Sequence, residues 1–140
     1  MSRREDILAA LQSRLNGVGA ATAYRSREAA VARAEGVVIL LRPEAEDVES
    51  LGVLPSVSSR SLVVVVTVIA RGDIPDHIAD PIITAAHAAL MADTTLGGLT
   101  AQVCEESTKW DFEQADQTAV AVEIRYRIRY HTAAASLSAS

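Results

Sequence analysis

The feature that most constrains this 140-residue chain is a two-residue alternation over residues 118–131. The even-numbered positions are apolar or aromatic: Val120, Val122, Ile124, Tyr126, Ile128 and Tyr130. The odd-numbered positions, which form the other parity of the strand, are mostly charged: Ala121, Glu123, Arg125, Arg127, Arg129 and His131. Successive side chains of a β-strand point to opposite faces of a sheet, so the pattern predicts a strand with one face on a core.

Four other segments predict strands. Residues 62–70 carry aliphatic side chains on both parities, which is typical of a central strand covered on both faces. Shorter runs over residues 21–25, 37–41 and 103–112 predict three further strands. Gly97-Gly98 predicts a turn, and residues 113–117 predict a polar hairpin connection before the last strand.

Residues 42–60 predict a long acidic loop because two prolines and a glycine accompany a group of acids. A connection of this length in a compact domain is usually functional or mobile. Its acidic side chains are therefore candidate contact residues for a partner: Glu44, Glu46, Asp47 and Glu49.

The first predicted helix covers residues 3–15. Ser2 and Glu5 have the spacing of a capping box, in which each side chain satisfies a backbone N–H of the other residue. Asn16-Gly17 supplies a residue suited to the left-handed conformation that often ends a helix.

The second predicted helix covers residues 80–92, with Asp80 as N-cap and Pro81 at the first helical position. Its core face is Ile82, Ile83, Ala86 and Leu90, and its opposite face is Ala85, Ala88, Ala89 and Ala92. No charge lies between Asp80 and Asp93, whereas an ordinary surface helix is charged on its outer face. A neighbouring subunit would cover such a face, with Ala88 and Ala92 as the candidate contacts.

The order helix, three strands, helix, two strands predicts an α+β fold. Its mostly antiparallel or mixed sheet of about five strands would carry both helices on one face. We assign residues 1–132 to a single domain and expect the Ala/Ser-rich residues 133–140 to be a flexible tail. A lone cysteine excludes an internal disulfide.

Composition narrows the function classes. The net charge of −5 disfavours a dedicated nucleic-acid binder. The acidic N-terminal residues do not suit a signal peptide, and no segment approaches the roughly 20 apolar residues of a membrane span. We therefore expect a soluble protein made in the cytoplasm.

Residues suited to catalysis are sparse. His77, His87 and His131 have no metal-ligand spacing with Cys104 or a carboxylate, and His87 is interpreted as a packed residue at a helix edge. Cys104 has no basic neighbour and is interpreted as a small buried hydrophobe. We expect no enzymatic activity, no metal and no cofactor.

One polar group stands apart: the row Arg125, Arg127 and Arg129, whose guanidiniums lie roughly 7 Å apart on one strand face. The row either covers a solvated outer face with its aliphatic stems or contacts a partner through phosphates or carboxylates. The acidic residues 44–49 of a neighbouring copy are a candidate, and a repeated contact of this kind closes into a ring.

The order of elements and a series of short matches resemble the tail terminator family of long-tailed phages and prophages, most clearly over residues 61–132. The matching segments are Arg71-Gly72-Asp73-Ile74-Pro75-Asp76, Ala79-Asp80-Pro81, His87-Ala88-Ala89-Leu90-Met91-Ala92-Asp93, Leu96-Gly97-Gly98-Leu99, Glu105-Glu106, Trp110 and Arg125-Tyr126-Arg127-Ile128-Arg129-Tyr130.

The resemblance implies a hexameric ring that ends tail-tube polymerisation and offers a joining surface to the head. Its partners would be further copies of the chain, the tail tube protein and head–neck connector proteins, with DNA only as cargo passing through the lumen. The location would be the head–tail junction of the virion. Two alternatives stay open: another neck, connector or tail tube component, and a small nucleic-acid-binding module that uses the arginine row.

Overall fold

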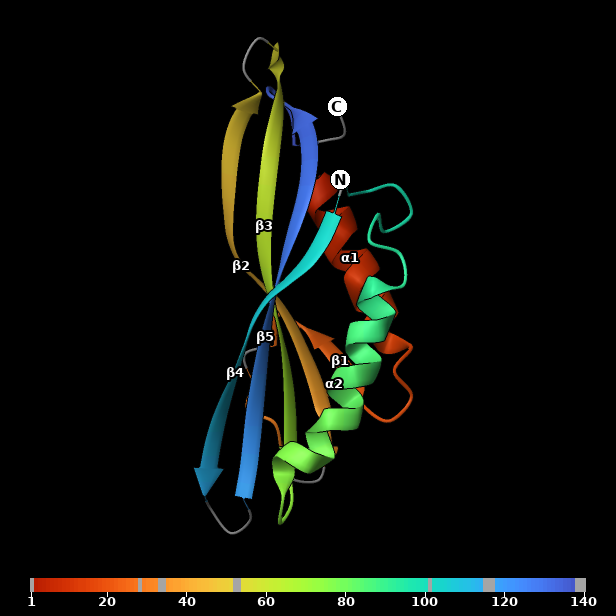
Figure 1. Cartoon of the computed structure of the whole chain (residues 1–140), viewed down its shortest axis with the longest axis vertical. Coiled ribbons are helices and arrows are strands. Elements are labelled where there is room, and N and C mark those ends of the chain that lie inside the picture. Colours follow the sequence, from red (N-terminus) through yellow and green to blue (C-terminus); the bar gives the residue numbers. More distant parts are fainter. Residues whose placement is uncertain are drawn as a thin grey trace.

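The computed structural model describes residues 2–27, 29–32, 35–51, 54–100, 102–114 and 118–137. Two helices cover one face of a strongly twisted five-stranded sheet (Figure 1). Along the chain the elements are α1 (Arg3–Asn16), β1 (Thr22–Arg25), β2 (Val38–Leu51), β3 (Leu54–Arg71), α2 (Pro75–Met91), β4 (Gln102–Gln114) and β5 (Thr118–Ala133). The predicted α+β class and the element order α-β-β-β-α-β-β are confirmed.

The two strands with the strongest sequence patterns form the centre of the sheet. The strand order is β1-β2-β3-β5-β4, in which only β1 and β2 are parallel. β5 buries its apolar parity as predicted. β3 buries residues on both faces, since Val64 and Val66 lie on the helix side and Val63 and Val65 on the other. The sheet therefore has an inner face under the helices and an outer face without them.

Both helices pack their apolar stripes on the inner face. α1 contributes Ile7, Leu8, Leu11 and Leu15, and α2 contributes Ala79, Ile82, Ala86 and Leu90. These side chains contact the inward parities of β3 and β5 in one hydrophobic core. Neither described helix is long and apolar enough to cross a membrane.

The predicted acidic loop is wrong. Apart from residues 52 and 53, which lie outside the described part, residues 42–60 belong to β2 and β3, paired from Val38↔Ile69 to Leu51↔Leu54. β1 pairs with β2 only as far as Leu41, so the rest of β2 is an edge strand. An edge tolerates Pro43, and a register shift directly follows this residue.

At the ends of α1, the capping box is only half formed and the predicted left-handed residue is absent. The Oγ of Ser2 accepts a hydrogen bond from the Glu5 N–H at 3.1 Å, but the Glu5 carboxylate pairs with Arg25 and does not complete the capping box. Gly17 has φ −77° and ψ −6°, so it is right-handed. Its N–H donates to the Arg14 carbonyl at 3.2 Å, which tightens the last turn without a left-handed residue.

The predicted start of α2 is also wrong. The helix begins at Pro75, and Asp80 and Pro81 lie inside it. Two Pro-containing start signals compete here, and Pro75 occupies the first helical position because Pro75 and Ala79 can then both be buried on the sheet. The predicted turn at Gly97-Gly98 is confirmed, with φ of +72° and +93°.

Two predicted segments extend past the described residues. In the hairpin connection 113–117, residues 113 and 114 belong to β4 and residues 115–117 lie outside the description. In the predicted tail, residues 138–140 also lie outside it. The Leu137 carbonyl accepts a hydrogen bond from the Arg3 N–H at 2.9 Å, so this part of the tail lies against the start of α1.

Replacing Pro81 by Ala tests the position of this residue in α2. Inside a helix, proline removes a backbone hydrogen bond and crowds the preceding turn, so Pro81→Ala should raise the free energy of unfolding by about 1–3 kcal/mol. Urea denaturation followed by circular dichroism measures the change. Pro75→Ala is the matched control, because Pro75 occupies the position that favours proline, and it should give no gain. A neutral Pro81→Ala would contradict the helix start at Pro75.

Candidate interaction surfaces

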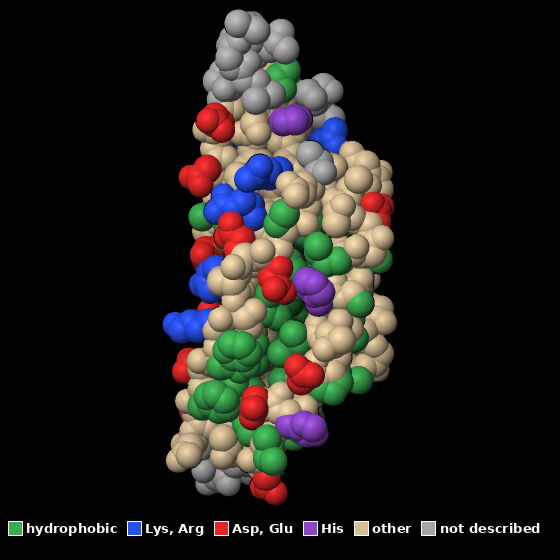
Figure 2. Space-filling model, in the orientation of Figure 1, with side chains coloured by type: hydrophobic (Ala, Val, Ile, Leu, Met, Phe, Trp, Pro, Cys, Tyr) green, Lys and Arg blue, Asp and Glu red, His purple; other side chains and the backbone are tan. Residues whose placement is uncertain are grey.

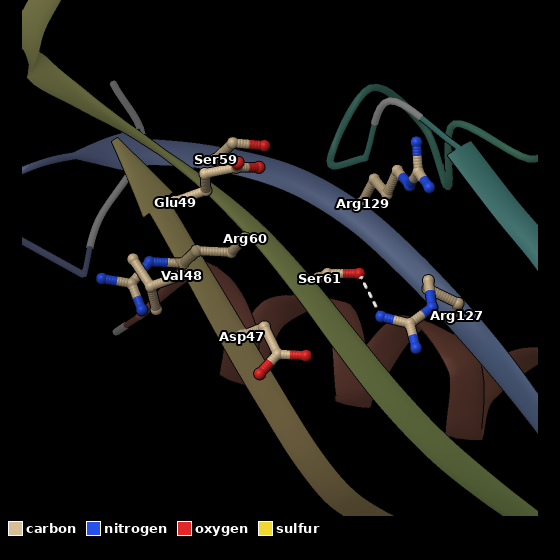
Figure 3. A pocket seen from close by; sticks show the side chains of 8 residues that line it. All are labelled: Asp47, Val48, Glu49, Ser59, Arg60, Ser61, Arg127 and Arg129. Atoms are coloured by element: carbon tan, nitrogen blue, oxygen red, sulfur yellow. Dashed lines mark hydrogen bonds between the residues drawn. The ribbon is translucent and has the colours of Figure 1, made fainter. Parts of the chain in front are cut away.

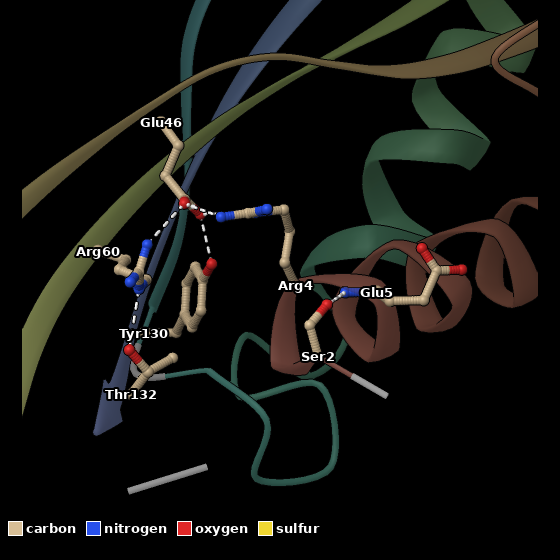
Figure 4. Close-up of polar contacts among 7 residues, drawn as sticks. All are labelled: Ser2, Arg4, Glu5, Glu46, Arg60, Tyr130 and Thr132. Carbon is tan, nitrogen blue, oxygen red and sulfur yellow. Dashed lines mark hydrogen bonds and ion pairs between the residues drawn. The ribbon is translucent and has the colours of Figure 1, made fainter. Parts of the chain in front are cut away.

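A buried polar cluster connects α1 to the sheet through Glu46, whose side chain is only 11% exposed. The Glu46 carboxylate accepts hydrogen bonds from Arg4 at 2.5 Å, from Arg60 at 3.1 Å and from the Tyr130 hydroxyl. Arg60 also donates to the Thr132 hydroxyl at 2.9 Å (Figure 4). This carboxylate is satisfied inside the chain, so Glu46 serves the fold.

The same cluster shifts the pKa of its acidic members. Burial alone would raise the pKa of the Glu46 carboxyl, but the hydrogen bonds from Arg4, Tyr130 and Arg60 outweigh it and lower the pKa below its ordinary value. Burial and the hydrogen bond to Glu46 raise the pKa of Tyr130 to about 12. The cluster therefore holds an ionised carboxylate and a neutral phenol at neutral pH.

The arginine row lies on the outer face, and two of its members are paired inside the chain. Arg125 contacts Glu44 at 2.9 Å, and this hydrogen bond lowers the pKa of the Glu44 carboxyl. Arg127 pairs with Glu106 and donates to the Ser61 hydroxyl at 2.7 Å. For Arg125, the acidic partner that the sequence suggested from a neighbouring copy is supplied by its own chain.

Arg129 is the exposed member of the row and has no ion pair among the described residues. It borders a hollow of about 450 Å³ on the outer face (Figure 3). The lining residues are Asp47, Val48, Glu49, Ser59, Arg60, Ser61, Arg127 and Arg129. Asp47 and Glu49 are exposed and make no ion pair in the described structure, although Asp47 interacts electrostatically with Arg127. The hollow therefore presents two exposed carboxylates and, in Arg129, one guanidinium without an ion pair. One guanidinium is a weak site for a phosphate backbone, which disfavours the nucleic-acid alternative.

The alanine face of α2 is exposed, as expected for a surface without an intramolecular partner. Ala85, Ala88 and Ala92 are solvent-exposed, and Ala89 is half-buried against the core. Small uncharged side chains allow a second backbone to approach closely. This face can therefore accept a flat, closely packed neighbour.

The sequence did not single out an aromatic pair on β4. Trp110 and Phe112 are the only Trp and Phe of the chain, and their side chains are 53% and 54% exposed. Both lie on the inner face at the edge of the sheet, opposite Val122 and Val120 of β5. Figure 2 shows hydrophobic side chains gathered over the lower half of β4 and beside α2. The sequence shows that Trp110 and Phe112 lie on the same face of their strand, but it does not show that this strand forms an open edge of the sheet.

In the described part of the chain, the histidines and the cysteine belong to no group of three or more side chains that could hold a metal ion. His87 is half-buried at the edge of α2, as predicted, with Nδ1 2.9 Å from the Tyr126 hydroxyl and 3.3 Å from a Glu105 carboxylate oxygen. His77 and His131 are exposed. Cys104 is only partly buried, so its interpretation as a buried hydrophobe was too strong.

Comparisons with known proteins give likenesses among solved structures only. No family model matches the chain, and no curated protein matches it. Among solved structures, a chain from the virion of a native gene transfer agent particle is 15% identical, with a TM-score of 0.43, over 88% of this chain and 94% of that chain. A likeness at this level carries no information about function.

Glu46 and Glu44 form a matched pair for testing the buried cluster. Glu46→Gln leaves Arg4 and Arg60 without their shared carboxylate in a partly buried site, so it should lower the free energy of unfolding by about 1–3 kcal/mol. Glu44→Gln removes an exposed ion pair and should cost far less. Urea denaturation at neutral pH measures the loss in unfolding free energy of each variant. Equal losses for the two variants would contradict the structural role of Glu46.

The lowered pKa of Glu46 predicts an acid dependence of stability. Because the folded-state pKa lies below the unfolded value near 4.5, the carboxylate stabilises the fold fully above that pH, and this contribution is lost as pH falls through the folded pKa. The difference in unfolding free energy between the wild type and Glu46→Gln should therefore shrink as the pH falls below about 4.5 and through the folded-state pKa. Denaturation curves at several pH values measure it. A difference that grows on acidification would refute the assignment.

Proposed function

We propose that the chain is a structural virion protein that caps the tail tube of a long-tailed phage as a ring of identical subunits. The ring, a hexamer if the family resemblance holds, ends tube polymerisation and provides the joining surface for the head–neck connector proteins. It acts at the head–tail junction and has no catalytic residues. DNA passes through its lumen only as cargo.

The observation that carries the proposal is the exposed, uncharged face of α2. Ala85, Ala88 and Ala92 are exposed on a helix without a charge between Asp80 and Asp93. A contact between this face and a different patch on the next copy is heterologous, and such contacts form a ring when the rotation between successive subunits closes on itself. The segment resemblance over residues 61–132 supplies the identity of the ring. The α+β architecture agrees with it.

The arginine row has a smaller part than the sequence suggested. Arg125 and Arg127 are neutralised by Glu44 and Glu106, so only Arg129 is free to contact a neighbour. Asp47 and Glu49 are exposed acids without an ion pair that line the same outer-face hollow as Arg129. A contact between subunits through Arg129, Asp47 and Glu49 would form a single ion-pair network at the rim of the ring. Charges at the rim of an interface fix how the two surfaces align more than they increase the binding affinity.

Ala88→Glu tests the ring. A carboxylate on the alanine face would be buried unpaired at every subunit contact, and overpacking alone costs about 1–3 kcal/mol per contact. Since Ala88 is exposed in the single chain, the variant should stay folded but fail to assemble and fail to cap purified tail tubes. Light scattering across a concentration series, alone and with tubes, measures assembly.

Ala9→Glu is the matched control, because Ala9 is an exposed alanine on α1 and the substitution adds the same charge. This variant should assemble like the wild type. A wild-type chain that stays monomeric at every concentration, both alone and with tail tubes, would overturn the ring. Normal assembly of Ala88→Glu would exclude the alanine face as its contact.

A further inference from the structure

One edge of the sheet is open along a regular strand. β4 is the last strand in the order β1-β2-β3-β5-β4, so its second edge has no neighbour in the described structure. After a register shift between Glu105 and Ser107, its pairing with β5 is continuous from Ser107 to Gln114. An unpaired edge of a regularly paired strand is a template for an added strand.

The two faces of this edge differ in chemistry. Trp110 and Phe112 point to the inner face and are more than half exposed. Lys109, Asp111 and Glu113 have the opposite parity and are exposed on the outer face. A strand added here would place one parity against two aromatic rings and the other beside two carboxylates.

The N-terminal end of α2 lies at the same end of the molecule as Phe112. The Gly72 N–H donates to the Thr118 carbonyl at 3.0 Å, which joins the segment before α2 to the start of β5. Ile78 lies so close above Gly72 that a Cβ there would come within 2.3 Å of its side chain. Thr118 pairs with Gln114 of β4, and Phe112 lies two residues before Gln114 on the same strand. Figure 1 shows the start of α2 beside the β4–β5 hairpin end.

The side of α2 that faces β4 is acidic in its first turns. His87 on α2 lies 3.3 Å from Glu105 on β4, which identifies that side of the helix. Helical spacing places Ile83, Asp80 and Asp76 on the same side, successively nearer the helix start. Asp76 and Asp80 are exposed and unpaired among the described residues. Carboxylates therefore lie on two sides of Trp110 and Phe112: on the side of α2 that faces β4, and along β4 itself.

The charge at this end selects the partner. Two cations lie at this end, Lys109 and Arg71, and Arg71 lines the same hollow as Asp111 and Glu113. They are outnumbered by five exposed carboxylates without an ion pair within the described chain: Asp73, Asp76, Asp80, Asp111 and Glu113. Two copies paired edge to edge about Asp111 would bring Trp110 beside Phe112 and Lys109 beside Glu113. They would also bring two strongly acidic ends together, and this repulsion disfavours a second copy as the occupant.

The chain also lacks a free strand of the complementary pattern among its described elements. β5 alternates apolar residues with Arg125, Arg127 and Arg129, but β3 and β4 already occupy its two edges. We propose that the open edge of β4, residues 107–114, binds an extended segment of another protein in which apolar residues alternate with Lys or Arg. This binding edge is a feature beyond the proposed ring, and its test does not require the ring.

Trp110 is the only tryptophan, so its fluorescence reports on this edge directly. The probe is a short synthetic peptide without aromatic residues, in which Val alternates with Lys. Its addition to the full chain should shift the Trp110 emission to shorter wavelength and reduce quenching by acrylamide. Added salt should weaken the binding, because the recognition includes exposed charges. A peptide in which Val alternates with Glu should give no response.

Two variants separate the contribution of the aromatic rings to peptide binding from that of the carboxylates. Phe112→Ser keeps the reporter and removes half of the aromatic contact, so it should weaken peptide binding at least about tenfold. Asp111→Asn with Glu113→Gln should weaken it several-fold and flatten the salt dependence. The matched control is Asp47→Asn with Glu49→Gln, which removes two exposed carboxylates from the open edge of β2 and should leave the Trp110 response unchanged. Circular dichroism checks folding, and the charge variant decides if Phe112→Ser unfolds.

Three results would overturn the proposal. The first is equal binding of the Val/Lys and Val/Glu peptides, and the second is an unchanged affinity in the charge variant. The third is a blue shift of Trp110 that grows with protein concentration alone and is strengthened by salt, because it would identify a second copy as the occupant.

Discussion

The pairing of β3 with β5 is the constraint on which the other features depend. It runs without a register shift from Val57↔Ala133 to Arg71↔Ala119. This register places the apolar parities of both strands under the helices and sets Val63 and Val65 beside Arg127 and Arg125 on the outer face. A slip of one residue would turn the arginines into the core, so the alternation and the register enforce each other. The helices, the buried valines and the arginine row all follow from this one ladder.

Charge is distributed unevenly over this frame. Most described arginines are used within the chain, where they contact carboxylates or backbone carbonyls: Arg3, Arg4, Arg14, Arg25, Arg27, Arg60, Arg71, Arg125 and Arg127. The unpaired carboxylates instead collect on β2 and around the start of α2. A row of three arginines in the sequence thus leaves only Arg129 free. Counting charges from the sequence overstates the basic surface and understates the acidic one.

The sequence predicts the parts of the fold whose signals are local. The alternation of β5, the apolar β3 and the Ser2 cap all act within a few residues, and each is confirmed. The acidic half of β2 was misassigned because its partners are distant: Glu46 contacts Arg4, Arg60 and Tyr130, which lie 42, 14 and 84 residues away. Composition indicates a loop there, and only the tertiary pairing makes it a strand. The aromatic pair was missed for a related reason, since edge position is a property of the whole sheet.

α2 separates the two surfaces proposed for contacts. Its core stripe faces the sheet, the side that holds His87 and Asp80 faces β4, and Ala88 with Ala92 lies roughly a third of a turn farther round. A neighbouring copy on the alanine face would therefore leave the edge of β4 open. The two contacts also differ in kind, because one depends on small uncharged side chains and the other on aromatic rings beside carboxylates. A ring closed through the first could still bind a basic strand of another protein through the second, so assembly and partner binding need not compete for the same surface.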